Sequence, residues 1–281
     1  MKTVTKIKFA KIIFYLISFF GIKQRRISQR NLIKWNLDLS EAIDLSIFLT
    51  GSFQGNIVKS ITKLIIKKKL YSKKINIIDI GSNIGDKSLS LCKNLIDKKI
   101  NNFKIFSIEP TEYAFQKQTE NLKLNPLLKK KIFLSKLYVV ENKKKIKKAY
   151  SSWKLNTASN SHKIHKGILK NIKKNTKNIS LDKFIDKNKI KNLIILKIDT
   201  DGLELEVLKS CIKSIKKYNV IIFMEYAPYL LKEHGYTEKD FHKFINKHGY
   251  FIYDLEFNQI SSVKIGSGSS TDVLLIKDKL I

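Results

Sequence analysis

The chain of 281 residues has few of the features that divide a protein into separate parts. It contains only three prolines and two cysteines, and no stretch repeats with a period of about 20–50 residues. This length suits one well-buried α/β domain with an N-terminal extension. Cys92 and Cys211 fall on the apolar stripes of expected helices, and neither is spaced with histidines as metal ligands are. We expect buried, reduced thiols and a cytoplasmic location.

Acidic residues are scarce beside basic ones. The chain has 24 Asp and Glu against 55 Lys and Arg, which gives a formal net charge of +31. Such a balance suggests nucleic acid or an anionic membrane as a partner. The bases are nearly all lysines spread over every segment, and no RNA-binding aromatic signature or helix-turn-helix spacing accompanies them. We therefore favour a solvated lysine-rich surface over a surface that binds nucleic acid.

The apolar run near the N-terminus is too short to span a bilayer. Ile12–Ile22 has 11 residues, whereas a spanning helix needs about 20. Lysines and arginines flank this run on both sides, so we expect residues 1–30 to form a helix that contacts an anionic membrane surface through residues 9–26. A soluble helix and a cleaved signal peptide are the alternatives. Residues 31–70 are expected to form a helical cover, because Ile57, Ile61 and Leu64 recur at helical spacing.

A strand, a glycine turn and a helix follow one another from residue 77. The run Ile77–Ile80 is typical of a buried parallel strand, and Leu89, Cys92 and Ile96 recur at helical spacing after it. The first N–H groups of that helix point toward the carboxyl end of the strand, where an anionic group is stabilised. The turn residues expected to bind a cofactor are Gly81, Ser82, Asn83 and Gly85.

A second apolar strand, Lys104–Ile108, ends on Glu109 just before Pro110, a residue suited to open a helix. Glu109 comes 24 residues after Gly85, about the separation at which a βαβ unit brings an acid to the ribose hydroxyls of an adenosine cofactor. Two neighbouring hydroxyl donors suit one carboxylate acceptor. Glu109 and Pro110 are therefore assigned to the cofactor site.

The spacing of the turn favours S-adenosylmethionine over a dinucleotide. A dinucleotide turn needs a second glycine where this chain has Asn83, whose side chain obstructs the approach to a pyrophosphate. Asp79 would also repel a phosphate, whereas it suits the positively charged amino and sulfonium groups of S-adenosylmethionine. We expect S-adenosylmethionine as the cofactor.

Acids also close further expected strands. In an open α/β sheet the ligand lies at the carboxyl ends of the strands, and the acids expected at this edge are Asp79, Glu109, Asp199 and Glu225. Asp201 and Glu204 follow at the start of the next helix. The polar stretch 141–178 is expected to be a flap over the site.

Methyl transfer to an oxygen needs a base that takes the hydroxyl proton. Asp199 is the preferred base, and His162 or His165 of the flap is the alternative. Asp201 and Glu204 are further candidate catalytic residues. No complete set of metal ligands is visible.

Several motifs resemble the FkbM family of S-adenosylmethionine-dependent methyltransferases. They are D-x-G-x-N-x-G at Asp79–Gly85, E-P at Glu109–Pro110, Asn121, Asn125, Leu181-Asp182, and L-K-I-D-T-D-G-L-E-L-E-V-L at Leu196–Leu208. The resemblance covers about residues 35–281. It implies an α/β class I methyltransferase domain over residues 71–281, with a Rossmann-like seven-stranded sheet and helices on both faces. The chain departs from the family's D-x-E-G-x-E pattern at Asp201, where glutamate is usual.

The resemblance also implies a reaction, which is O-methylation of a hydroxyl on a sugar, a glycan or a related natural product. Two other function classes compete with this expectation. One is a membrane-associated protein that binds RNA or another polyanion on a degenerate methyltransferase shell. The other is a nicotinamide oxidoreductase, which Asn83 disfavours.

Overall fold

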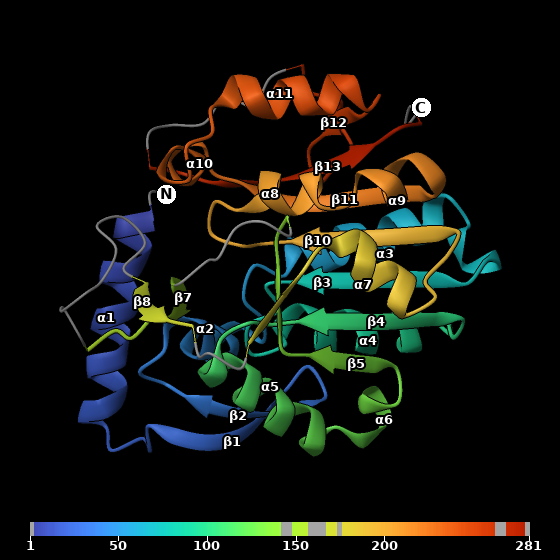
Figure 1. Ribbon diagram of the computed structural model, residues 1–281. Helices are drawn as coiled ribbons and strands as arrows, with labels where there is room; N and C mark the ends of the chain where they lie inside the picture. Colours follow the sequence, from blue (N-terminus) through green and yellow to red (C-terminus); the bar gives the residue numbers. More distant parts are fainter. Residues whose placement is uncertain (1–2, 142–147, 157–166, 173–175, 262–267, 279–281) are drawn as a thin grey trace.

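A seven-stranded sheet forms the centre of the computed structural model, which describes residues 3–141, 148–156, 167–172, 176–261 and 268–278 (Figure 1). Its strand order is β12-β13-β11-β10-β3-β4-β5. Neighbours from β11 to β5 run parallel, whereas β13 is antiparallel to both β11 and β12. The strands are β3 (Ile75–Ile80), β4 (Phe103–Ile108), β5 (Ile132–Ser135), β10 (Leu193–Ile198), β11 (Asn219–Tyr226), β12 (Phe251–Tyr253) and β13 (Thr271–Ile276).

Helices cover both faces of this sheet because the central strands are apolar on both sides. Along β10, Ile195 packs into one apolar cluster, while Ile194 and Leu196 pack into the other. Helices α3 (Asn56–Lys67) and α4 (Asp86–Asp97) contribute to the first cluster. The helices of the opposite face are α7 (Leu181–Lys187), α8 (Glu204–Lys209), α9 (Ile212–Lys217) and α11 (Glu238–Lys247). The expected seven-stranded sheet with helices on both faces is thus confirmed.

Residues 31–70 differ from the helical cover that we expected. Strands β1 (Arg25–Arg30) and β2 (Ile33–Asp38) form an antiparallel hairpin, and helices begin only with α2 (Ala42–Thr50) and α3. Asn31 and Leu32 form the two-residue turn with φ of 49° and 60°, as this turn geometry requires. The side chains of β2 that alternate into the core are Ile33, Trp35 and Leu37.

Two asparagines bind the backbone of β2. Asn121 lies in α5 (Glu112–Leu124), and Asn125 directly follows that helix. Asn121 Oδ1 accepts a hydrogen bond from Asn36 N at 2.8 Å. Asn125 accepts one from Lys34 N at 3.0 Å and donates one to Lys34 O at 2.7 Å. Asn121 Nδ2 also donates to Ile84 O at 3.0 Å, so the hairpin and the turn after β3 share one anchor. These contacts satisfy backbone groups that an edge strand would otherwise leave unpaired.

Helix α1 and the β7–β8 pair lie toward the carboxyl ends of the parallel strands (Figure 1). Helix α1 (Thr3–Phe19) packs against α2, and its Phe14 and Ile17 are buried in the first apolar cluster. Strand β7 pairs antiparallel with β8 close to α1 (Figure 1). No helix among the described residues is both long enough and apolar enough to cross a membrane. The other elements are β6 (Leu137–Val139), β7 (Lys148–Ser152), β8 (Ile168–Asn171), β9 (Lys177–Ile179), α6 (Pro126–Lys129) and α10 (Pro228–Glu233).

The hairpin generates a stability prediction. Trp35 is fully buried, with 0% of its surface exposed, so Trp35→Ala should lower the free energy of unfolding by about 3–5 kcal/mol. Ile27 of the same hairpin is 62% exposed, and Ile27→Ala should change it by no more than about 0.5 kcal/mol. Urea denaturation of both variants measures the difference. Equal losses would show that β2 is not packed into the core.

Candidate active site

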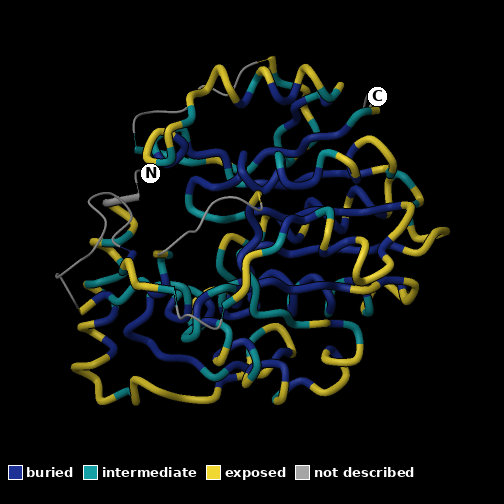
Figure 2. The backbone as a smooth tube through the Cα atoms, viewed as in Figure 1, coloured by how far each residue is buried: buried dark blue, intermediate teal, exposed yellow. Residues whose placement is uncertain are grey.

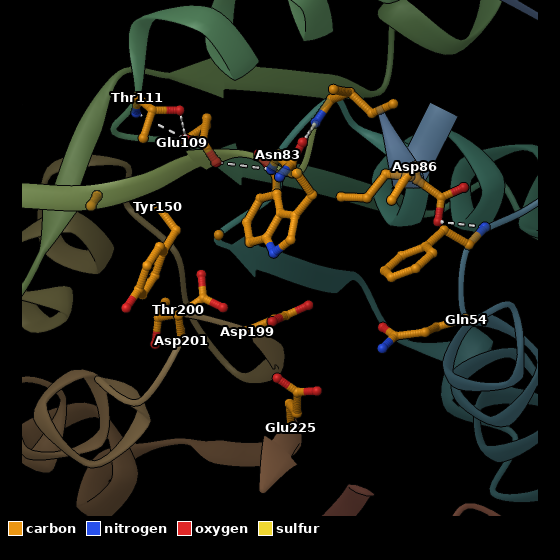
Figure 3. Close-up of a pocket in the computed structure, with 18 of the residues that line it drawn as sticks. Gln54, Asn83, Asp86, Glu109, Thr111, Tyr150, Asp199, Thr200, Asp201 and Glu225 are labelled. Atoms are coloured by element: carbon orange, nitrogen blue, oxygen red, sulfur yellow. Dashed lines mark hydrogen bonds between the residues drawn. The ribbon is translucent and has the colours of Figure 1, made fainter. Parts of the chain in front are cut away.

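A cavity of about 680 Å³ opens at the carboxyl ends of the parallel strands (Figure 3). Its lining comes from the turns after β3, β4 and β10 and from the end of β11. This is the edge of the sheet at which the acids that close the strands predicted a ligand site. The N-terminal elements and residues 148–153, within the segment expected to be a flap, supply further walls. The residues that these two segments contribute include Ile7, Ala10, Ile13, Phe53, Gln54, Tyr150 and Trp153.

The turn after β3 is tightly packed against the end of β10. Gly81 has φ of 75°, and a Cβ atom there would lie 1.8 Å from the backbone oxygen of Asp199. Only glycine fits this place. Asn83 and Gly85 also have positive φ, 48° and 90°. Ser82 lines the cavity, while its hydroxyl donates to Gln118 Oε1 at 2.8 Å.

Glu109 forms part of the cavity wall and also binds the two loops beside it. Its Oε2 accepts a hydrogen bond from Asn83 N at 2.9 Å, and its Oε1 accepts from Thr111 N at 2.9 Å and from Thr111 Oγ1 at 2.6 Å (Figure 3). Burial raises the pKa of Glu109, and these hydrogen bonds oppose that rise. Because a carboxylate has about four acceptor positions, roughly one remains for a hydroxyl. Pro110 lines the cavity beside it.

Asp79 does not take the position that we expected. It is 2% exposed and does not line the cavity. Its carboxylate accepts from Ser88 Oγ at 2.6 Å and pairs with Lys197 Nζ at 3.1 Å. Strand β3 is buried on both faces, so its apolar pattern does not reveal which way Asp79 points. Asp79 is thus the counter-ion of a buried lysine.

Lys197 is the main residue that sequence reasoning missed. Its Nζ lies 3.1 Å from Asp79, 3.5 Å from Asp199 and 3.2 Å from Gly81 O. Burial lowers the pKa of Lys197, but the Asp79 and Asp199 carboxylates outweigh this effect and raise that pKa above its usual value. A lysine within the otherwise apolar run of β10 was the available signal.

Asp199, Asp201 and Glu225 extend into the same space, as Figure 3 shows. Burial, followed by the nearby Asp199 charge, raises the pKa values of Asp201 and Glu225 well above their ordinary ranges. Ser270 Oγ donates to Glu225 Oε1 at 2.6 Å and partly opposes that rise. The two carboxyl groups therefore favour their protonated, hydrogen-bond-donating form.

Glu204 and Gly85 lie outside the cavity lining, contrary to the expected direct roles. Glu204 Oε1 accepts hydrogen bonds from Thr200 N at 2.8 Å and from Gly202 N at 3.2 Å. It therefore shapes the loop that carries Asp201, which has φ of 51°. Gly85 precedes α4 and packs on Leu89. Glu204 and Gly85 thus support the cavity from behind.

The rim of the cavity joins segments far apart in the chain. Asp86 Oδ2 accepts a hydrogen bond from Phe53 N at 3.3 Å, and Lys87 Nζ donates to Phe53 O. Trp153 N donates to Glu41 Oε2 at 2.8 Å, which ties the flap to the start of α2. Sequence patterns gave no signal for these long-range contacts. Both candidate flap histidines, His162 and His165, lie outside the described residues.

Among the described residues, no group of three or more His, Cys, Asp or Glu side chains is arranged to hold a metal ion. Both cysteines are buried; neither forms a disulfide. The parallel sheet, the glycine turn and the acid after β4 together define a class I S-adenosylmethionine-dependent methyltransferase.

The comparisons with known proteins give the family. The model of the methyltransferase FkbM domain matches residues 79–252, more than half of the chain. The chain belongs to this family of S-adenosylmethionine-dependent enzymes. No curated protein sequence matches it.

Several solved structures resemble the chain at low sequence identity. The METTL16 methyltransferase domain has a TM-score of 0.47 at 12% identity, over 97% of this chain and 81% of that one. Magnesium protoporphyrin IX methyltransferase from Synechocystis PCC 6803 has a TM-score of 0.43 at 10% identity, over 97% of each chain. Methyltransferase FkbM from Methylobacillus flagellatus KT has a TM-score of 0.40 at 16% identity, over 72% of this chain and 43% of that one.

The close packing of Gly81 predicts a specific effect of adding one methyl group. Gly81→Ala should destabilise the fold by at least about 3 kcal/mol, because the backbone around Asp199 must move, and should weaken S-adenosylmethionine binding by more than about tenfold. Gly249 also has positive φ, 70°, but nothing lies within 4 Å of its added Cβ. Gly249→Ala should therefore cost only about 1–2 kcal/mol and leave binding unchanged.

Urea denaturation and calorimetry measure these two effects. The same loss of stability and the same affinity in both glycine variants would contradict the tight turn.

The raised pKa of Asp201 predicts a pH-dependent gain in stability. The folded protein holds this proton more tightly than the unfolded chain, whose value is near 3.8. The stabilising contribution is present below about pH 3.8 and is lost as the pH rises through the folded-state pKa. Asp201→Asn removes this dependence, so it should raise the melting temperature at pH 7 by about 2–4 °C, with the gain vanishing near pH 4.

Thermal melts across this pH range provide the measurement, with the exposed Asp186→Asn as the matched control. A gain for Asp201→Asn that does not depend on pH would exclude ionisation as its cause.

Proposed function

We propose that the enzyme O-methylates a hydroxyl group of a sugar, a glycan or a related natural product. The observation that carries this proposal is the cluster of Asp199, Asp201 and Glu225 in one cavity, across from the turn after β3 (Figure 3). One member pairs with Lys197, and burial favours the protonated form of the other two. Such a cluster offers both a proton acceptor and proton donors to a hydroxyl.

The cavity fits the cofactor that the family uses. A volume of about 680 Å³ lies within the usual range for small-molecule sites, about 300–1,000 Å³. Gly81, Ser82 and Asn83 bring the turn after β3 into the cavity wall. Asn83 N is already bound to Glu109, which suits the cofactor better than a pyrophosphate that needs free amides. The residues proposed to hold the cofactor are Gly81, Ser82, Asn83, Glu109 and Pro110.

S-adenosylmethionine supplies a methyl carbon activated by a positively charged sulfur. In the proposed mechanism Asp199 would accept the proton of the acceptor hydroxyl. The hydroxyl oxygen would gain the methyl group as the carbon–sulfur bond breaks, and the cofactor would leave as a neutral thioether. Lys197 holds Asp199 in place through the 3.5 Å ion pair. Asp201 and Glu225 donate hydrogen bonds that orient the acceptor, so much of the rate enhancement comes from positioning.

A saccharide acceptor is supported by the remaining walls of the cavity. Tyr150, Tyr229 and Trp153 contribute aromatic surfaces, which pack well against the C–H faces of a sugar. Burial, with help from Glu233 and Asp201, raises the pKa of Tyr150 to about 12, so its hydroxyl stays protonated at neutral pH. Carboxyl and phenol groups can then bond to sugar hydroxyls.

The proposal also gives the enzyme a location, which is the cytoplasmic face of a membrane contacted through residues 9–26. The apolar and basic composition of this segment supports it. The competing hypothesis of an RNA-binding protein is supported by the net charge of +31 and not by any feature of the cavity.

Product analysis tests the reaction. Labelled S-adenosylmethionine would be offered with a panel of monosaccharides, nucleotide sugars and glycosides. A labelled methyl ether, which survives alkaline hydrolysis, is the expected product. A base-labile methyl ester or a methylated amine would overturn O-methylation of a hydroxyl.

The assignment of Asp199 as the base predicts a loss of turnover without a loss of cofactor. Asp199→Asn keeps the shape of the side chain but cannot accept the proton, so turnover should fall by about 10²–10⁴-fold. The affinity for S-adenosylmethionine should stay within about threefold. Calorimetry and the labelled-methyl assay measure the two effects, with Asp186→Asn as a control far from the chemistry. Unchanged turnover would eliminate Asp199 as the base.

A further inference from the structure

Helix α1 exposes a broad apolar surface, which we call its outer face. At about 100° per residue, its members fall within an arc of about 140°. Their exposed fractions run from 52% to 83%. The outer face consists of Ile12, Tyr15, Leu16 and Phe19 of α1, with Phe20 directly after the helix, and Figure 2 shows this helix at the margin of the molecule. Phe9, which is 61% exposed, lies at the edge of this face and also lines the cavity.

The opposite side of α1 is fully used by the fold. Phe14 and Ile17 are buried at 6% and 9% exposure. Ile7, Ala10 and Ile13 line the cavity. A helix that carries apolar side chains toward solvent as well as toward the core has a second apolar surface that a partner can cover. The outer face is therefore an interaction surface on a helix that the fold already anchors.

The charge around this face identifies its partner. The first 37 residues contain nine lysines and arginines and no acid. Lys8 lies on α1, and Lys23, Arg25 and Arg26 follow it; all four are exposed. Exposed aromatic residues next to basic ones are typical of helices that lie in the headgroup region of a membrane. A symmetric dimer through this face would bring two such basic segments together, which is unfavourable.

We propose that the outer face of α1 docks the enzyme on an anionic lipid bilayer. The apolar side chains insert among the acyl chains, and the flanking bases contact lipid phosphates. This inference rests on the proposed membrane location and adds the face of α1 and the side chains that make the contact. Since α1 also walls the cavity, docking places the active site beside the bilayer surface.

Vesicle flotation of the full chain tests the docking. Wild-type protein should float with phosphatidylcholine vesicles that contain phosphatidylglycerol, and less with phosphatidylcholine alone or in high salt. Phe19→Ser combined with Phe20→Ser should lower the partition coefficient at least about tenfold. Lys8→Gln and Lys23→Gln should each lower it about fivefold.

Matched controls use residues of equal exposure elsewhere. Leu127 is 71% exposed on α6, and Lys73 is an exposed base outside α1. Leu127→Ser and Lys73→Gln should float like wild type. Retained S-adenosylmethionine binding in the double Phe variant verifies its fold and keeps this test separate from the methylation assay.

Three results would overturn the docking. They are wild-type protein that stays unbound, equal flotation with neutral vesicles, and normal flotation of the double Phe variant. Light scattering provides a further check. A wild-type dimer that the double Phe variant dissociates would show that a second copy covers the outer face instead.

Discussion

The buried ion pair between Lys197 and Asp79 fixes the place where β3 and β10 end. Both side chains are removed from water, at 3% and 2% exposure, and such a pair is costly unless its geometry is good and its other hydrogen bonds are made. The lysine meets this condition with Asp199 and Gly81 O as further partners. Lys197 thereby holds the turn after β3, and this turn places Asn83 N against Glu109. Replacing either ion alone would leave an uncompensated charge directly beneath the cavity.

Those parts of the site that depend on strand ends could be predicted from the sequence. Parallel strands bring their carboxyl ends to one edge, so a residue's place after an apolar run is enough to assign it there. Gly81, Glu109, Asp199 and Glu225 were found in this way, and all four line the cavity. The seven-stranded sheet followed from the same strand pattern and from the family resemblance.

Other parts depend on information that a local pattern does not contain. Asp79 lies in a strand buried on both faces, so periodicity does not tell which way its side chain points. Lys197 pairs with Asp79, which lies in a distant segment of the chain. The hairpin before α2 has strands of only six residues, and its Asn31-Leu32 turn lacks the glycine that usually marks such a turn. Long-range contacts thus account for most of what the sequence left open.

The double use of α1 has a practical consequence for handling the protein. Its exposed aromatic residues invite deletion of the N-terminal helix to improve solubility. The same deletion would remove Ile7, Ala10 and Ile13 from the cavity wall and uncover the part of α2 that α1 contacts. A shortened chain would therefore present a wider cleft that is more open to water. Polar substitutions on the outward side of the helix are the way to gain solubility while leaving the cavity intact.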